Sequence, residues 1–169
     1  MILFLCTGNA ARSVMAGAAL AAHLPAVTVE TAGTLTVDGQ PMSHRTRGAL
    51  AAVGLEPPVH RSRQVSAGDL DRATLVIGLA PEHVGWVCRH HPGASPRTAS
   101  LQRLSRDLQP PPPGPLADRV ASMDLAAIEP EPWEEVIDPG GGEVEDFVAC
   151  AREIVALVAT LATHLHEDS

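Results

Sequence analysis

The 169-residue sequence predicts an α/β fold, because short apolar segments alternate along it with segments of helical character. Three apolar segments are typical of strands: residues 1–5 (MILFL), 27–31 (VTVET) and 74–79 (TLVIGL). A fourth, shorter strand is expected near residues 97–101. Strands separated by helices usually pair in parallel. We therefore expect one three-layer domain, with about four parallel strands and helices on both faces.

The segments between the strands carry helix signals. Residues 13–24 are rich in alanine, and Pro25 is expected to end this helix. A second helix is expected at residues 44–53, with Gly54 placed to cap its end. The third, at residues 81–91, begins with a proline, which suits the first turn of a helix.

The carboxy-terminal part begins with a break at residues 109–115 (QPPPPGP). Its consecutive prolines favour a stiff polyproline II spacer, and a recognition motif for proline-binding modules is the alternative. Helices are expected at about 115–127 and 143–165, the latter with apolar residues at helical spacing. We interpret residues 1–169 as a single domain with a proline-rich acidic insertion at about 105–135.

Composition and charge exclude some classes of partner. With four aromatic residues and a net charge of −8, the chain is poorly suited to stacking on bases or binding a nucleic-acid backbone. Residues 1–107 carry 10 Arg against 7 Asp and Glu, a net of +3, whereas residues 108–169 carry 2 against 13, a net of −11. An anionic ligand is therefore expected in the amino-terminal two thirds, and the acidic remainder is typical of a solvated face.

The cysteines indicate a reducing compartment. Cys6, Cys88 and Cys150 are too few and too scattered for a disulfide framework, and no Cys/His zinc spacing occurs. The sequence shows neither a signal peptide nor an apolar run of membrane-spanning length. We therefore expect a cytoplasmic protein without a membrane partner.

The segment of residues 6–13 (CTGNAARS) fits the pattern C-x5-R-S and joins a predicted buried strand to a predicted helix. A loop in this position presents backbone N–H groups and the positive end of the helix to an anion. Gly8 and Asn9 tolerate the left-handed backbone that curls such a loop, and Arg12 can bind two phosphoryl oxygens. The predicted phosphate-binding residues beside Arg12 are Thr7, Gly8, Asn9, Ala10, Ala11 and Ser13.

Cys6 stands at the start of this loop and is the candidate nucleophile. The positive surroundings favour its thiolate and stabilise the charge of a phosphoryl group during transfer. The hydroxyl of Ser13 is placed to donate a hydrogen bond to the thiolate. The competing interpretation is structural: a cysteine that ends a core strand and an arginine on a helix surface.

A phosphatase also needs a general acid for the leaving group, and Asp138 is the candidate. It lies in a predicted loop before the last helix, and Pro139 restricts the backbone there to extended or turn conformations. On these observations alone, Asp138 also fits an ordinary turn residue or helix-start acid.

The sequence resembles the low-molecular-weight protein-tyrosine phosphatase family in four segments that occur in the family's order. These are residues 6–13 (CTGNAARS), 31–34 (TAGT), 60–65 (HRSRQV) and 136–139 (VIDP). The resemblance implies a phosphocysteine intermediate on Cys6, phosphoryl binding by Arg12 and proton transfer by Asp138. It further implies that Asn9 holds the loop in shape, with Thr31 and His60 in the supporting hydrogen-bond network, and that no metal or cofactor takes part.

The sequence departs from the family pattern around the pocket. Ala11 replaces a second loop cysteine that forms a protective disulfide with the nucleophile, so Cys6 is expected to be more open to irreversible oxidation. Glycines at 140–142 stand where the family often has an aromatic residue, and the 34–40 loop lacks a Trp or Tyr. Ala10 matches neither the branched aliphatic residue of phosphotyrosine enzymes nor the threonine of phosphoarginine enzymes. We expect a wider and more polar pocket.

These observations predict a cysteine-dependent phosphatase that hydrolyses phosphomonoesters, nominally phosphotyrosine in proteins. The alternative on the same scaffold is a phosphatase for phosphoarginine or for a small phosphorylated metabolite. An arsenate reductase is disfavoured because Cys88 and Cys150 are isolated on predicted helices and do not form the expected pair. A non-catalytic phosphate-binding protein is disfavoured because Cys6, Arg12 and Asp138 are all present.

Overall fold

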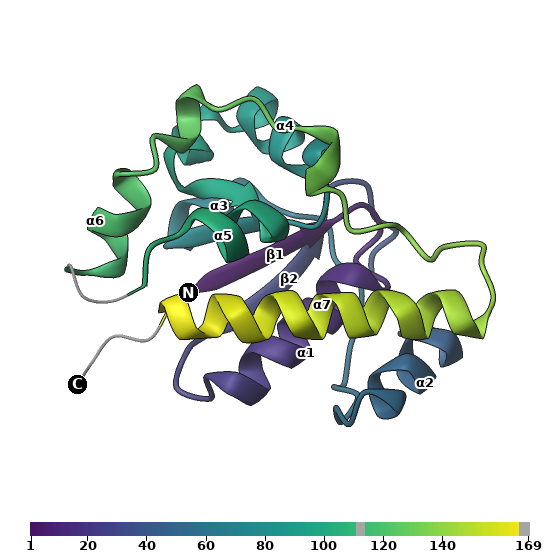
Figure 1. Ribbon diagram of the computed structural model, residues 1–169. Helices are drawn as coiled ribbons and strands as arrows, with labels where there is room; N and C mark the ends of the chain where they lie inside the picture. The colour runs from purple at the N-terminus through teal and green to yellow at the C-terminus, as the bar shows by residue number, and fades with distance from the viewer. Residues whose placement is uncertain (111–113, 166–169) are drawn as a thin grey trace.

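The computed structural model describes residues 1–110 and 114–165, and within them four parallel strands form one sheet (Figure 1). The strands are β1 (Ile2–Cys6), β2 (Val29–Gly33), β3 (Leu75–Gly78) and β4 (Thr98–Ser100), in the order β2-β1-β3-β4. β1 lies inside the sheet because it pairs with both β2 and β3. The predicted α/β fold with a parallel sheet is confirmed.

Helices cover both faces of the sheet, as expected from the buried pattern of its strands. Phe4 and Cys6 belong to one hydrophobic cluster, and Leu3 and Leu5 belong to a second one on the opposite face. The first face is covered by α1 (Arg12–His23), α2 (His44–Ala52), α5 (Leu101–Asp107) and α7 (Val144–Leu165). The second is covered by α3 (Ala67–Arg72) and α4 (Pro81–His90).

The helix α7 corrects the expectation that no apolar segment of the chain reaches membrane-spanning length. It is 22 residues long and contains an 18-residue window of mean hydropathy 1.5, which is sufficient for a membrane span by length and composition. However, one side of the helix is buried in the core, with Phe147, Ile154, Val158 and Leu161 at most 6% exposed. This side packs against α1, α2 and α5 (Figure 1). The composition of α7 is therefore that of a central helix of the fold.

Two predicted elements are displaced or broken. The strand expected at 27–31 is β2, two residues later, because the chain is still turning out of α1 and the N–H of Val27 donates to the carbonyl of Leu24 at 3.0 Å. The helix expected at 115–127 is only α6 (Leu116–Ala121) followed by a 3-10 helix (Leu125–Ala127). Asp124 separates them with a left-handed φ of 50°, which no regular right-handed helix accommodates.

Four short helices were not predicted: α3, α5 and the 3-10 helices Pro92–Arg97 and Pro132–Glu134. Side-chain caps rather than apolar periodicity define the first two. Ser66 and Asp69 form a capping box at α3, and Ser100 caps α5. The expected end of α2 is confirmed, since Gly54 follows it with a φ of 78°.

The insertion predicted at 105–135 contains α6 and two 3-10 helices. Residues 111–113 of its proline run lie outside the described residues, so the expected polyproline spacer stays a prediction. The loop after β1 and the segment around Asp138 meet at the carboxyl end of the sheet, where open α/β sheets bind their ligands.

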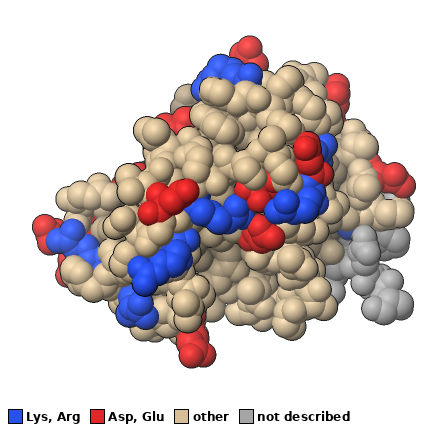
Figure 2. Space-filling view, turned by 180° about the vertical axis from the view of Figure 1, so that it is seen from behind, with Lys and Arg blue, Asp and Glu red and all other residues tan. Residues whose placement is uncertain are grey.

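The charges of the surface are mixed. Figure 2 shows the face opposite to that of Figure 1, where arginine and carboxylate side chains lie beside one another. Arg63 is an explicit case in the structure, because it binds Glu30 and Asp69 at 2.7 Å each. Arg72 binds the same Asp69 at 2.9 Å. Several arginines of residues 1–107 are thus paired with carboxylates that the net charge of +3 for this region already counts.

Candidate active site

The loop of residues 6–11 turns sharply between β1 and α1, and its neighbours make room for the turn. Asn9 adopts a left-handed φ of 50°, a conformation that asparagine tolerates better than most residues. Gly33 at the end of β2 lies directly against the loop, where a Cβ would collide with the carbonyl oxygen of Thr7 and with Thr36. The loop and β2 are further joined by the N–H of Thr34, which donates to the carbonyl of Cys6 at 2.9 Å.

The fully buried side chain of Asn9 holds the loop together. Its amide nitrogen donates to Ser13 Oγ at 3.0 Å and to Thr31 Oγ1 at 2.9 Å. Its amide oxygen accepts the backbone N–H of Arg63 at 3.0 Å. The backbone carbonyl of Asn9 accepts a hydrogen bond from His60 Nε2 at 2.7 Å, which places the proton of that ring on Nε2. Asn9, Thr31 and His60 therefore belong to one hydrogen-bond network, the arrangement that the family resemblance implies.

Cys6 ends β1 and is buried, with its Sγ 3.0 Å from Ser13 Oγ. The oxygen of Ser13 already accepts a hydrogen bond from Asn9, so the hydroxyl hydrogen of Ser13 is free to point toward the sulfur. The chain Asn9–Ser13–Cys6 thus links the shape of the loop to the position of the candidate nucleophile.

Arg12, at the start of α1, joins the loop to the segment around Asp138. Its side chain is only 3% exposed and donates to the carbonyl of Val136 at 3.0 Å and to Asp138 Oδ2 at 2.7 Å. A guanidinium has five N–H donors, so three remain beyond these two contacts for a phosphoryl group. Arg12 and Asp138, which are 126 residues apart in the chain, are thus in direct contact at one site.

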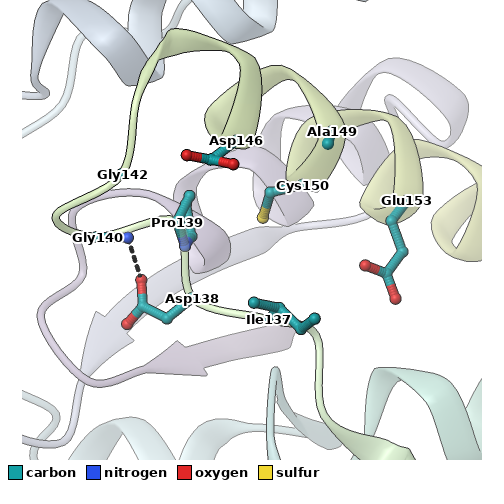
Figure 3. Close-up of a pocket in the computed structure, with 9 residues that line it drawn as sticks. All are labelled: Ile137, Asp138, Pro139, Gly140, Gly142, Asp146, Ala149, Cys150 and Glu153. Atoms are coloured by element: carbon teal, nitrogen blue, oxygen red, sulfur yellow. Dashed lines mark hydrogen bonds between the residues drawn. The ribbon is translucent and has the colours of Figure 1, made fainter.

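The segment around Asp138 is fixed on both sides of the carboxylate. The N–H of Val136 donates to the carbonyl of Leu79 at 2.9 Å, which attaches the segment to the chain just after β3. The N–H of Gly140 donates to Asp138 Oδ1 at 2.9 Å, as the dashed line in Figure 3 shows. The side chain of Asp138 nevertheless stays 52% exposed, so it is accessible to a ligand.

A histidine that the sequence did not single out lies beneath the loop. His83, on the first turn of α4, is 1% exposed, and its Nε2 is 3.1 Å from Thr7 Oγ1. Burial lowers the pKa of His83 to about 3; the positive charge of Arg12 acts in the same direction and Asp138 opposes it. His83 is therefore a neutral ring at physiological pH that packs under a phosphate-loop residue.

A cavity of about 330 Å³ adjoins Asp138 on the side of α7 (Figure 3). Ile137, Asp138 and the glycines that follow form one wall, and the other wall comes from α7, with Asp146, Cys150 and Glu153. Carboxylates, glycines and aliphatic side chains therefore line this cavity, and none of its lining residues is aromatic. Burial raises the pKa of the Cys150 thiol to about 12, so this thiol is not a ready nucleophile.

The structure brings every predicted site residue into one region, and it adds supporting residues. Thr46 of α2 donates to the carbonyl of Ala10 at 3.1 Å, and Thr36 donates to the carbonyl of Thr7 at 3.2 Å. The exposed Ala10 forms part of the rim of the loop. Across residues 1–110 and 114–165, no three His, Cys, Asp or Glu side chains gather in a group that would hold a metal ion.

This geometry agrees with the comparisons with known proteins. Residues 1–106 match the model of the family described as low molecular weight phosphotyrosine protein phosphatase. The chain belongs to this family. A protein-arginine-phosphatase of Geobacillus stearothermophilus is 30% identical over 168 residues, which cover 99% of this chain and 97% of the relative. A probable low molecular weight protein-tyrosine-phosphatase, EpsP, of Ralstonia solanacearum is 32% identical over 61% of this chain and 69% of its own length.

Solved structures of the family have the same fold. The YwlE arginine phosphatase from G. stearothermophilus has a TM-score of 0.76 at 30% identity, covering 95% of this chain and 89% of that one. The tyrosine phosphatase Wzb from Escherichia coli K30, in complex with sulphate, has a TM-score of 0.78 at 19% identity, covering 98% and 97%. The chain is therefore a cysteine-dependent phosphatase, and its fold class and family were predicted correctly from the sequence.

Proposed function

We propose that this phosphatase hydrolyses phosphoarginine in proteins, with Cys6 as the nucleophile, Arg12 as the phosphoryl ligand and Asp138 as the general acid. The observation that carries the choice of substrate is the cavity beside Asp138, whose α7 wall presents the carboxylates of Asp146 and Glu153 and whose lining residues include no aromatic ring for an aryl phosphate to pack against. The side chain of arginine keeps a positive charge that such a wall attracts.

In the first step, the thiolate of Cys6 attacks phosphorus, and the bond from phosphorus to the guanidino nitrogen breaks. Arg12 and the loop N–H groups stabilise the charge on the equatorial oxygens during the transfer. The phosphoryl group binds the N–H donors of Arg12 that contact neither Val136 nor Asp138, so the contact with Asp138 keeps the carboxyl group beside the reacting phosphorus. Asp138 then protonates the departing nitrogen, which leaves as the free arginine side chain.

In the second step, water attacks the phosphorus of the phosphocysteine. The carboxylate of Asp138 takes a proton from this water, the phosphorus–sulfur bond breaks and Cys6 returns as a thiolate. Ser13 stabilises the thiolate as leaving group through the contact of 3.0 Å between Oγ and Sγ. The products are inorganic phosphate and the unmodified protein side chain, so no cofactor enters the balance.

The relatives support this substrate. The protein-arginine-phosphatase relative is similar over nearly the whole chain, whereas the tyrosine-phosphatase EpsP is similar over 61% of it. Phosphotyrosine remains the second candidate because one structural feature favours an aryl group. Leu35 and Val37 in the 34–40 loop are 78% and 73% exposed, and the N–H of Leu35 donates to the carbonyl of Thr7. Their side chains are therefore available to pack against a ring.

A pair of peptides of identical sequence, one with phosphoarginine and one with phosphotyrosine, tests the proposal. We expect kcat/KM for the phosphoarginine peptide to exceed that for the phosphotyrosine peptide by more than tenfold. Cys6→Ser is expected to be inactive on both peptides, and Cys88→Ser serves as the matched control that keeps activity. A preference for the phosphotyrosine peptide would refute the substrate while leaving the mechanism intact.

The charge of the cavity can be tested separately. Asp146→Asn removes one negative charge from the wall but keeps an oxygen that can accept the N–H of Glu143. An exposed charge pair contributes about 0.5–1 kcal/mol, so kcat/KM for the phosphoarginine peptide should fall about two- to fivefold. Glu145→Gln, on the same turn of α7 but outside the cavity wall, is the control and should have no effect. Equal losses on both peptides would show that the charge does not select the substrate.

A further inference from the structure

A buried ion pair lies four residues before Asp138 and belongs to no part of the site described so far. Glu134 ends the 3-10 helix Pro132–Glu134 and is only 1% exposed. Its carboxylate accepts hydrogen bonds from Arg103 Nη2 and from Ser100 Oγ, both at 2.5 Å. It also accepts the N–H of Glu131 at 2.8 Å. The buried carboxylate of Glu134 is therefore fully hydrogen-bonded, which matters because an unpaired carboxylate in the interior would be costly.

The partners of Glu134 belong to the rigid part of the fold. Ser100 is the last residue of β4 and caps α5, and the same hydroxyl oxygen accepts the N–H of Arg103 at 3.0 Å. Burial alone would raise the pKa of Glu134, but the hydrogen bonds from Arg103 and Ser100 outweigh it and lower the pKa. The pair therefore stays ionised at neutral pH and fixes Glu134 to the sheet.

Trp133, the exposed residue before Glu134, also attaches this 3-10 helix to α5. The ring of Trp133 lies under the guanidinium of Arg106, at 3.8 Å from the ring centre, and Arg103 lies at 5.1 Å. Arginine over the face of an indole is a favourable arrangement. Trp133 and Glu134 thus hold the same turn through two neighbouring arginines of α5.

The segment of residues 135–138 has no regular secondary structure, so its contacts determine where it lies, and the bond from the N–H of Val136 to the carbonyl of Leu79 is one of them. One end adjoins the buried Glu134, and the other is the contact of Arg12 with Val136 and Asp138. Between them, Val136 is buried, whereas the side chains of Glu135 and Ile137 are exposed. Two fixed points four residues apart leave Asp138 little freedom to move.

We propose that Glu134 is a positioning residue that sets the place of the Asp138 carboxyl group through its ion pair with Arg103 and its hydrogen bond from Ser100. This inference rests on the proposed role of Asp138 as general acid. A carboxyl group that is displaced protonates the leaving group poorly, whereas phosphoryl binding by Arg12 and the loop is retained. The effect of losing Glu134 should therefore depend on how much the leaving group needs a proton.

The experiment compares kcat/KM for p-nitrophenyl phosphate, whose leaving group needs little protonation, with that for phenyl phosphate, whose leaving group needs more. For Glu134→Gln we expect a loss of about tenfold or more on phenyl phosphate, below the 10²–10⁴ of a missing acid. We expect the same variant to lose less than threefold in kcat/KM on p-nitrophenyl phosphate. Glu135→Gln, the exposed neighbour, is the matched control and should change neither value.

Asp138→Asn separates the two proposals. If it leaves the ratio of the two substrates unchanged, the general-acid role itself is wrong. If it shifts the ratio but folded Glu134→Gln does not, the positioning role alone is refuted. The double variant should show no larger ratio than Asp138→Asn, because Glu134 would act only through Asp138. Additive effects of the two changes would also overturn the proposal.

Thermal unfolding first establishes that each variant is folded. If Glu134→Gln does not fold, the measurement is made on Ser100→Ala, which keeps the ion pair and removes one hydrogen bond to Glu134. In this variant, kcat/KM for phenyl phosphate should fall relative to that for p-nitrophenyl phosphate by a smaller factor, about two- to fivefold. No change of the ratio in folded Ser100→Ala would then count against the proposal.

Discussion

Replacement of Asn9 tests whether one side chain holds the phosphate loop. Asn9→Ala removes two donated hydrogen bonds, to Ser13 and Thr31, and the one accepted from the N–H of Arg63. At about 1 kcal/mol each, these account for about 3 kcal/mol. The left-handed φ of 50° costs alanine about 1 kcal/mol more. We therefore expect the free energy of unfolding to fall by about 4 kcal/mol.

Urea denaturation measures this change, and two control variants separate the contribution of the hydrogen bonds from that of the left-handed backbone. Asn9→Gly loses the same hydrogen bonds but tolerates the left-handed backbone, so it should be less destabilised than Asn9→Ala. Thr31→Val removes a single hydrogen bond and should cost about 1 kcal/mol. In the folded fraction, kcat/KM of Asn9→Ala should fall about hundredfold because the loop is misplaced. A loss of stability below about 1 kcal/mol would refute the role of Asn9.

Three further predictions concern the surroundings of the loop. In the native protein the pKa of His83 is about 3, so below about pH 6.5 the unfolded chain binds a proton that the native state does not, and stability falls with falling pH. His83→Gln should reduce this dependence of the unfolding free energy on pH by up to about 1.4 kcal/mol per pH unit between about pH 6 and 4. An unchanged dependence on pH would contradict the assignment. Gly33→Ala should cost about 1–3 kcal/mol and most of the activity because its Cβ collides with the loop, whereas Gly48→Ala, with open space in α2, should be neutral or stabilising in thermal unfolding. Ala11→Cys should let dithiothreitol restore activity after peroxide treatment by forming a disulfide with Cys6, while the unaltered protein should lose activity irreversibly; equal recovery of both would argue against this protection.

The sequence was sufficient for the parts of the site that are local in the chain. A buried strand, a C-x5-R-S loop and a helix follow one another directly, so Cys6, Arg12 and Ser13 were identified from their order alone. The family resemblance added Thr31 and His60 and supported Asp138, which its place in a loop before the last helix had already made a candidate. The structure confirms that the side chains meet, because His60 and Asp138 bind Asn9 and Arg12 directly.

The supporting residues could not be predicted because their meaning depends on contacts between distant segments. His83 follows a proline and a glutamate at a helix start and looks like a surface residue, yet the helix places it under Thr7. Arg103 and Glu134 are charged residues in segments without apolar periodicity, which ordinarily indicates solvent exposure. Their burial becomes evident only when α5 and the 3-10 helix pack together.

Short capped helices account for most of the remaining differences. The six residues of α3 contain one large apolar side chain, so the hydrophobic pattern gave no helix signal there. Its capping box, Ser66 with Asp69, was present in the sequence and would have indicated the start. The break of the predicted 115–127 helix at Asp124 follows from a left-handed residue that composition does not mark.

The central claim is that phosphate passes through a covalent bond to the sulfur of Cys6. It is tested most directly by mixing the protein with a phosphoarginine peptide, quenching within one turnover and locating the phosphate by mass spectrometry of the proteolysed chain. We expect a phosphate group on Cys6, absent from Cys6→Ala and longer-lived in Asp138→Asn. Phosphate on another residue, or turnover without any phosphorylated protein, would contradict the account.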